Sequence, residues 1–342
     1  MKAIECPKDL IYTSEHTEGF TRIKRGKGFS YHDASGNIIK DAETIDRIKA
    51  LGIPPMWDKV WISPNPRSHV QATGLDQKER KQYIYHSAWT EYRNLAKFSR
   101  IEAFGLAIPT IREHTSTLLN EKGWSKEKVV CLVIQMMDEY HVRIGNQYYK
   151  DQHETFGATT LRNKHLDFEK GVGKLEYKAK SGKYRKISLR NNQLSKLIKE
   201  CAELPGYEIF TYQEENRKYQ AINSHDVNEY LHQIAGENFS SKDFRTWGGT
   251  TLAVESQAKA LKAVEENPRL KYESALVKIV AQDLGNTVSV CKEYYIHPEV
   301  LKTVINEDLK PYSLRTKIKL PSSKRKLLRD SEIVTLNILQ KA

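Results

Sequence analysis

The spacing of apolar and polar residues changes near residue 90 of the 342-residue chain. Before that point the apolar residues come in short alternating runs, FSYHDASGNIIKD, VWISPNP and KQYIYH, and turn residues between them make the pattern typical of strands. One helix is expected over residues 41–52, where an acidic cap precedes Ile45, Ile48 and Leu51 at helical spacing and a glycine follows them. The pattern predicts a small β-rich N-terminal domain over residues 1–90.

Beyond residue 90 the pattern is mainly helical. The segment AWTEYRNLAKFSRIEAFGLAIPTIREHTSTLL has apolar residues at the spacing of successive helices. The exception is KLEYKAKSGKYRKISL, in which Leu175, Tyr177 and Ala179 alternate with charged residues before a Ser-Gly turn. This alternation predicts a β-hairpin whose polar face carries a row of lysines. The expected fold is therefore α+β, with the hairpin inside a larger, mainly helical domain over residues 91–310.

Positive charge dominates the composition, with 55 Lys and Arg against 43 Asp and Glu, a formal net charge of +12 and a pI near 9.3. Basic residues are dense after Lys310, so residues 311–342 are expected to form a basic C-terminal extension, or to dock as a short helix. The excess favours a polyanionic partner, with nucleic acid ahead of an anionic membrane surface.

A membrane partner and secretion are not expected. The longest apolar run, VVCLVIQMM, is far shorter than the roughly 20 residues of a membrane-spanning helix. The first residues, MKAIECPKDLIYT, lack the apolar core of a signal peptide. We therefore expect a cytoplasmic protein, nucleoid-associated if the host is bacterial.

Several familiar chemistries have no motif in the chain. Cys6, Cys131, Cys201 and Cys291 are scattered without a CxxC pair, which argues against structural zinc and a disulfide framework. The sequence also lacks HExxH, GxxxxGK[ST] and GxGxxG. We therefore expect no metal and no small-molecule cofactor.

Three cationic residues are candidates for phosphate chemistry, and each has a structural alternative. Arg143, in HVRIGN, follows an apolar helix and could instead cap its C-terminus. Lys180, near the hairpin tip, could donate a proton to a leaving oxygen or simply lie on a solvated face. Arg245, between two aromatic residues in SKDFRTWGGT, could clamp a phosphate with forked donors or form a salt bridge with Asp243.

The first domain offers a candidate DNA-binding surface. Basic and aromatic residues interleave in HVQATGLDQKERKQYIYH, a composition that suits contacts with phosphates and a DNA groove, although a charged hairpin on an ordinary surface has the same pattern. With two lysines of the second domain, the predicted DNA-binding set is Gln71, Arg80, Lys81, Tyr83, Tyr85, His86, Lys183 and Lys242.

Two adjacent tyrosines, Tyr294 and Tyr295, lie at the end of a short predicted helix. The segment SALVKIVAQDLG predicts a helix that stops at Gly285, and a second helix can begin at Thr287 and stop before Pro298. The two tyrosines fall on different faces of that second helix, and periodicity does not choose between them. A tyrosine at a helix end is usually part of a core or an interface.

In this order, the motifs resemble those of the poxvirus and bacterial type IB DNA topoisomerases. The shared elements are RIGN, AKSGK, KDFRTWGGT, and LGNT followed by YIHP, and they contain Arg143, Lys180, Arg245, Asn286 and Tyr295. The likeness extends through DASGNIIKDAETIDRIKALGIPPMWDKVWISP and FGATTLRNKHL and covers most of the chain. Val288 and Ala179 depart from the pattern, at positions where relatives often have Pro and Gly, without removing a reactive group.

The resemblance implies a two-domain clamp around duplex DNA that relaxes supercoils by cutting and resealing one strand without ATP or metal. Tyr295, which follows Asn286 at the family's spacing, would attack a backbone phosphorus and form a 3′-phosphotyrosyl bond. Arg143, Arg245 and Asn286 would stabilise the transition state, because phosphoryl transfer adds negative charge to the non-bridging oxygens. Lys180 would protonate the leaving 5′-oxygen. One clamp and one tyrosine suffice to cut one strand, so we expect a monomer.

Two other functions compete with this interpretation. Tyrosine recombinases share the order of reactive residues but usually carry HxxRH around the second arginine, where this chain has Lys242 and Thr246. Their N-terminal domain is typically a helical bundle rather than β-rich. The other alternative is a non-catalytic duplex DNA-binding protein with the same fold, and the presence of all five reactive residues argues against it.

Overall fold

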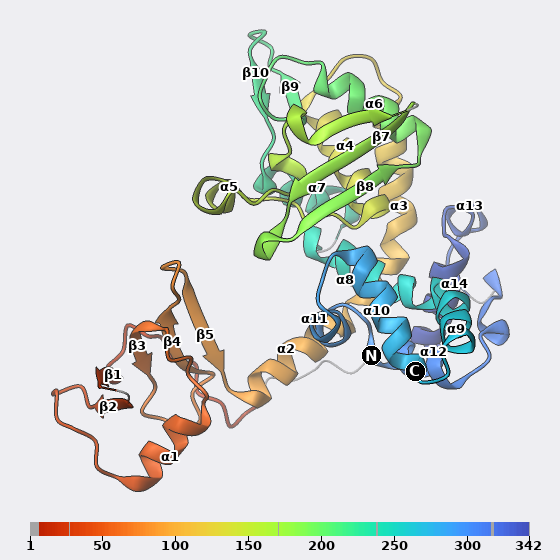
Figure 1. Cartoon of the computed structure of the whole chain (residues 1–342). Helices are drawn as coiled ribbons and strands as arrows, with labels where there is room; N and C mark the ends of the chain where they lie inside the picture. The colour runs from red at the N-terminus through yellow and green to blue at the C-terminus, as the bar shows by residue number, and fades with distance from the viewer. Residues whose placement is uncertain (1–6, 27, 170, 237–238, 316–317, 342) are drawn as a thin grey trace. The chain divides into compact units, whose positions relative to one another are not determined.

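The computed structural model describes residues 7–26, 28–169, 171–236, 239–315 and 318–341 (Figure 1). Contacts between Cα atoms divide the chain into two compact units, Met1–Ser99 and Arg100–Ala342. Among the described helices, none combines the length and the apolar character that crossing a membrane requires.

The first unit is a five-stranded antiparallel sheet in the order β2-β1-β3-β4-β5, accompanied by two helices. The elements are β1 (Phe20–Arg25), β2 (Gly28–His32), α1 (Ala42–Ala50), β3 (Asp58–Ile62), β4 (Val70–Leu75), β5 (Lys81–Tyr85) and α2 (Ser87–Ser99).

The helix predicted over residues 41–52 is confirmed as α1. Its N-cap is Asp41, whose carboxylate accepts a hydrogen bond from the Thr44 amide at 2.8 Å, and Gly52 follows the helix at φ +62°. Ile48 of α1 packs with Val60, Ile62 and Ala72 of the sheet to form the core of this unit.

The second unit is mostly helical and contains two small antiparallel sheets. Its α-helices are α3 (Ile101–Leu119), α4 (Lys126–Tyr140), α5 (Gln147–His153), α6 (Asn192–Ala202), α7 (Ser224–Ala235), α8 (Ser241–Glu255), α9 (Gln257–Glu266), α10 (Tyr272–Leu284), α11 (Val288–Tyr294), α12 (Pro298–Asn306), α13 (Ser322–Arg325) and α14 (Asp330–Lys341). The strands are β6 (Leu166–Glu169), β7 (Val172–Lys178), β8 (Tyr184–Leu189), β9 (Thr211–Gln213) and β10 (Tyr219–Ala221), and short 3₁₀ turns are η1 (Ala158–Thr160), η2 (Asn163–His165), η3 (Lys180–Gly182) and η4 (Lys310–Tyr312).

Helix α4 lies in the part of the second unit that also contains α3, α6 and α7 (Figure 1). Its apolar residues are buried on all sides, between α3, α6, α7 and α8, as expected for a helix without a solvent-facing stripe. The Ser125 hydroxyl caps its start by accepting from the Lys128 amide at 3.2 Å, and His141 ends it in the left-handed region at φ +52°. The end of α4 is therefore fixed immediately before Arg143.

The predicted hairpin is present as β7 and β8, with Tyr177 opposite Arg185. Leu175, Tyr177 and Ala179 are buried, so the alternation in the sequence predicted the inward face correctly. Helix α6 packs against both strands, and β6 pairs with the outer edge of β7.

Of the two expectations for the C-terminal stretch, the structure shows docking as a helix and not a separate basic extension. Helix α14 packs against α3, α8 and α12, and Ile333, Leu336 and Glu332 are buried. The density of basic residues between 310 and 329 hid the apolar residues that follow them in the sequence. The end of the described chain therefore contributes to the core of the second unit.

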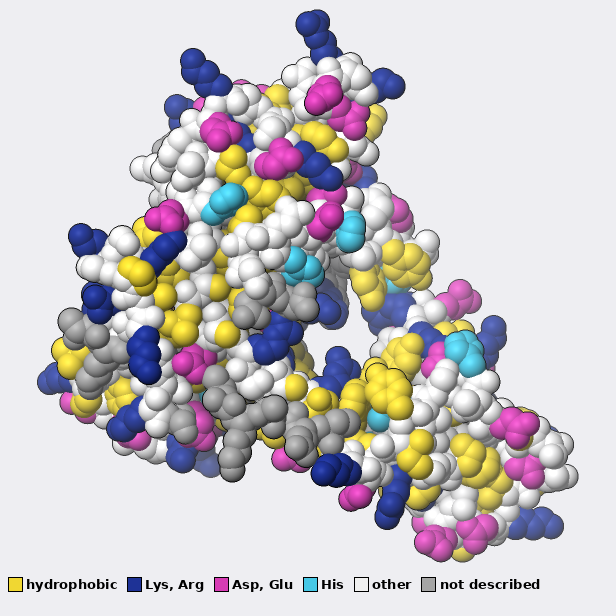
Figure 2. Space-filling model, turned by 180° about the vertical axis from the view of Figure 1, so that it is seen from behind, with side chains coloured by type: hydrophobic (Ala, Val, Ile, Leu, Met, Phe, Trp, Pro, Cys, Tyr) yellow, Lys and Arg dark blue, Asp and Glu magenta, His cyan; other side chains and the backbone are white. Residues whose placement is uncertain are grey.

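Lys and Arg side chains are spread among acidic ones over the face shown in Figure 2. Cys131, Cys201 and Cys291 are buried free thiols, and Cys6 lies outside the described residues.

Candidate functional site

Arg245 joins the ends of two helices. It lies in the first turns of α8, is only 3% exposed, and donates to the carbonyl oxygens of His141, after α4, and Leu284, at the end of α10. The Asp243 carboxylate accepts from the Ser240 amide at 2.7 Å, so it caps α8. Burial and the nearby Arg143 lower the pKa of Arg245 to about 10, which leaves it protonated at neutral pH.

Tyr295 lies directly beside Arg245. The guanidinium carbon of Arg245 is 5.0 Å from the centroid of the Tyr295 ring. The tyrosine ends α11, and its carbonyl accepts from the Thr250 hydroxyl at 3.2 Å. Gly249 permits this approach, because a Cβ there would lie 2.6 Å from the Tyr295 carbonyl oxygen. Tyr294 and Tyr295 are both half-buried, so burial does not distinguish them, but the ring under Arg245 is that of Tyr295.

Arg143 and Asn286 meet although they are far apart in the sequence. A terminal nitrogen of Arg143 donates to the side-chain oxygen of Asn286. Gly285, at φ +63°, ends α10 and turns the chain so that Asn286 faces this side. Within the described residues, the side-chain nitrogen of Asn286 and Nε of Arg245 are buried without a hydrogen-bond partner. Because an unpaired buried donor costs about 1–3 kcal/mol, both are suited to an incoming anionic oxygen.

The backbone around Arg143 is held by a close-packed loop. The Ala158 amide donates to the Arg143 carbonyl at 2.7 Å. A Cβ on Gly157 would lie 2.5 Å from the amide nitrogen of Gly145 and 2.6 Å from that same carbonyl oxygen. Only glycine fits at position 157, and the contact fixes the RIGN segment on the second unit.

Lys180 lies at the tip of the hairpin and is exposed. The tip is closed by hydrogen bonds from the Ala179 amide to the Lys183 carbonyl at 2.7 Å and from the Gly182 amide to the Ala179 carbonyl at 3.1 Å. Among the described residues, the hydrogen bonds that join the other predicted catalytic residues do not include Lys180. The structure thus brings together Arg143, Arg245, Asn286 and Tyr295, and leaves Lys180 on the neighbouring hairpin.

Arg185 is a residue that the sequence analysis missed. From β8 it donates to the carbonyl oxygens of Leu284 at 2.6 Å, Tyr140 at 2.8 Å and Asp283 at 3.0 Å. Burial lowers its pKa. The signal that could have found it is its place opposite Tyr177, which puts an arginine on the buried face of the hairpin.

Several residues of the predicted DNA-binding set have partners within the first unit. Gln71 is buried and its amide nitrogen donates to the Pro66 and Ser68 carbonyls at 2.9 and 2.7 Å, which gives it a structural role. Arg80 pairs with Asp76 at 2.6 Å, and Lys81 pairs with Glu15. His86 accepts from the Ala88 amide at 3.2 Å and caps α2. Lys183 and Lys242, in the second unit, are exposed.

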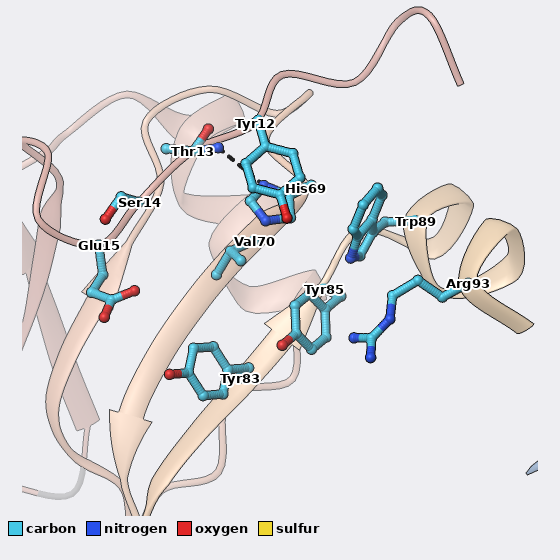
Figure 3. Close-up of a pocket in the computed structure, with 10 residues that line it drawn as sticks. All are labelled: Tyr12, Thr13, Ser14, Glu15, His69, Val70, Tyr83, Tyr85, Trp89 and Arg93. Atoms are coloured by element: carbon cyan, nitrogen blue, oxygen red, sulfur yellow. Dashed lines mark hydrogen bonds between the residues drawn. The ribbon is translucent and has the colours of Figure 1, made fainter. Parts of the chain in front are cut away.

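Tyr83 and Tyr85 line a hollow of about 800 Å³ on the first unit (Figure 3). The two rings stack at 5.8 Å, and the Arg93 guanidinium lies 5.5 Å from the Tyr85 ring centroid. Across the hollow, Tyr12 stacks on His69 at 3.9 Å. Aromatic rings and a cation therefore share one open surface, a combination that suits nucleic acid.

Comparisons with known proteins identify the family of the chain. The family of the eukaryotic DNA topoisomerase I catalytic core matches residues 86–317, and the family of the bacterial DNA topoisomerase IB N-terminal domain matches residues 28–76. DNA topoisomerase 1B of Acanthamoeba polyphaga mimivirus is 32% identical over 84% of this chain and 88% of its own length. DNA topoisomerase I of monkeypox virus is 23% identical over 82% of this chain and 88% of its own length. With matches that cover both units, the chain belongs to the type IB DNA topoisomerase family.

Proposed function

We propose that this chain relaxes supercoiled duplex DNA through a transient break in one strand, with Tyr295 as the nucleophile. The phenol oxygen of Tyr295 attacks a backbone phosphorus, the bond to the 5′-oxygen breaks, and a 3′-phosphotyrosyl bond forms. After the DNA has turned, the freed 5′-hydroxyl attacks the same phosphorus and releases the tyrosine. One diester replaces another in each step, so resealing needs no ATP.

The roles of Arg143, Arg245 and Asn286 follow from the charge of the reacting phosphate. Negative charge grows on the non-bridging oxygens at the transition state, and fixed cationic donors lower that barrier. Arg245 Nε and the Asn286 amide nitrogen are buried donors without a partner among the described residues, and phosphate oxygens would satisfy them. Two arginines supply the positive charge that a metal ion supplies in other phosphoryl-transfer enzymes, so we propose a reaction without metal or cofactor.

Lys180 is proposed as the general acid. The leaving 5′-oxygen needs a proton, and a lysine at the exposed tip of a hairpin can reach a bound strand. We further propose that duplex DNA contacts the Tyr83 and Tyr85 surface, and that a single copy of the chain suffices.

The contact of Arg245 with Tyr295 is the observation that carries the proposal, and a pair of matched variants tests it. Labelled plasmid is incubated with each protein and denatured, and the covalent adduct is measured. We expect Tyr295→Phe to lose both the adduct and relaxation, because the attacking oxygen is removed. Tyr294→Phe, the same change at the adjacent residue, should keep both. Formation of the adduct by Tyr295→Phe would show that Tyr295 is not the nucleophile.

A further inference from the structure

We infer that Arg185 is a positioning residue that anchors the Lys180 hairpin to the ends of the two helices that lead into Arg143 and Asn286. This inference rests on the proposed function, since it concerns how Lys180 is held for proton transfer. Arg185 is a different residue from the five proposed to act on DNA.

Arg185 bonds main-chain carbonyls of two helices outside its own sheet. Its partners are main-chain carbonyls at two helix ends, Tyr140 of α4 and both Asp283 and Leu284 of α10. Carbonyls in the last turn of a helix have no partner within the helix and carry the negative end of its dipole. The planar guanidinium spreads these bonds over two fixed nitrogens, with one nitrogen on Leu284 and the other on Tyr140 and Asp283, whereas an ammonium group would have to make them all from one nitrogen on a flexible stem.

The two helix ends carry reactive groups. Arg143 follows Tyr140 by three residues, and Asn286 follows Leu284 by two. The Leu284 carbonyl also accepts from Arg245 at 3.0 Å. The hairpin is therefore bonded through Arg185 to the segment that Arg245 also holds.

Arg185 and Lys180 lie five residues apart, and backbone hydrogen bonds close the hairpin tip between them. The tip between them is held by the bond from the Ala179 amide to the Lys183 carbonyl at 2.7 Å, and Ala179 is buried. On the other strand, the Phe156 amide donates to the Lys178 carbonyl at 2.8 Å. Near the tip, β7 is therefore held by Phe156 and β8 is held by Arg185. Loss of the Arg185 bonds would release β8 from the two helix ends and change the position of Lys180.

A leaving-group substitution separates loss of proton transfer from general damage. A duplex oligonucleotide is cleaved in single turnover with its ordinary bridging 5′-oxygen, and with sulfur in that position. A thiol, with a pKa of roughly 8.5, leaves without the proton that an alkoxide needs. We expect Arg185→Met to slow cleavage of the oxygen substrate about 10²-fold, as expected for a misplaced general acid. Its cleavage of the sulfur substrate should stay close to that of the unmodified protein.

The control is Lys186→Met, an equal loss of charge at the next residue, where the side chain is exposed and pairs with Glu176 at 2.9 Å. It should cleave both substrates normally. Arg185→Lys keeps the charge but has one donor nitrogen in place of two and a flexible stem in place of a planar fork, so we expect a smaller loss on the oxygen substrate and none on the sulfur substrate. This variant also serves if Arg185→Met does not fold.

The outcomes distinguish this inference from the proposed function. Equal losses on both substrates, or no loss on the oxygen substrate, would overturn the role of Arg185. Lys180→Met is measured in parallel. If sulfur restores Lys180→Met but not Arg185→Met, the inference about Arg185 fails and the general acid stands. If sulfur does not restore Lys180→Met, the proposed general acid itself is wrong.

Discussion

Replacing Glu332 by glutamine should lower the free energy of unfolding of the second unit by about 3 kcal/mol. Glu332 is fully buried. Its carboxylate accepts from Arg112 at 2.7 and 2.8 Å, from the Trp247 ring nitrogen at 3.2 Å and from the Arg329 amide at 2.7 Å. Arg112 also bonds both oxygens of Asp138, at 2.7 and 2.9 Å. One cation thus joins α3, α4 and α14.

The magnitude follows from what each change leaves unpaired. Loss of one partner of a buried ion pair costs about 3–5 kcal/mol. The lower end applies to Glu332→Gln, because Arg112 keeps Asp138 and the amide oxygen can still accept. Arg112→Met removes the cation that hydrogen-bonds both buried carboxylates, leaves them with Arg329 at 3.9 Å from each, and should cost about 5 kcal/mol. The control matched to Glu332→Gln is Glu113→Gln, next to Arg112 on α3. The Glu113 carboxylate is 56% exposed and pairs with Lys324, and a surface pair contributes at most about 1 kcal/mol.

Urea unfolding followed by helical circular dichroism measures the three variants, because the second unit holds most of the helices. The expected order of destabilisation is Arg112→Met, then Glu332→Gln, then Glu113→Gln. If Glu332→Gln cost no more than Glu113→Gln, burial would not be the source of the strength of this cluster, and the reasoning would be refuted.

Three further predictions concern acid, backbone packing and salt. Burial lowers the pKa of His141 to about 3 and the pKa values of His165 and His297 to about 4. Below the ordinary histidine pKa of 6.5 the unfolded chain binds more protons than the folded chain, so the free energy of unfolding should fall as pH drops. An equal urea midpoint at about pH 7.5 and about pH 5 would contradict this. Gly157→Ala should destabilise the second unit by about 1–3 kcal/mol and slow cleavage, because its Cβ would meet the Arg143 carbonyl; unchanged stability and single-turnover rates would refute the packing argument. Filter binding to duplex DNA should weaken by orders of magnitude between about 50 and about 200 mM salt, since each neutralised phosphate releases counterions, and a flat response would exclude phosphate-dominated binding.

Local signals in the sequence predicted local structure well. The acidic cap and glycine stop of α1, and the alternation of Leu175, Tyr177 and Ala179, both specify one element through its immediate neighbours. The pairing of Arg143 with Asn286 could not be found this way, because the two lie 143 residues apart; only the resemblance to a family suggested that they act together.

The missed features share a physical cause, since they depend on burial created by distant segments. Gln71 resembles a surface polar residue in the sequence, but Arg47 of α1, 24 residues away, donates to its side-chain oxygen at 3.1 Å. Arg185 has three carbonyl partners, and all three lie at least 45 residues away in the sequence. Helix α14 was hidden by the charge of the residues before it.

The ion cluster around Glu332 also determines when, during synthesis, the second unit can complete its core. A nascent chain that has reached Tyr295 contains every residue proposed to act on DNA, but it lacks α14 and so leaves Arg112 without Glu332 and the apolar faces of α3 and α8 without their cover. The second unit cannot complete its core until α14 has been synthesised and has left the ribosome. A chain released earlier would expose the apolar surface that α14 covers and would leave Arg112 without Glu332, so we expect it to be proteolysed more readily than the whole chain.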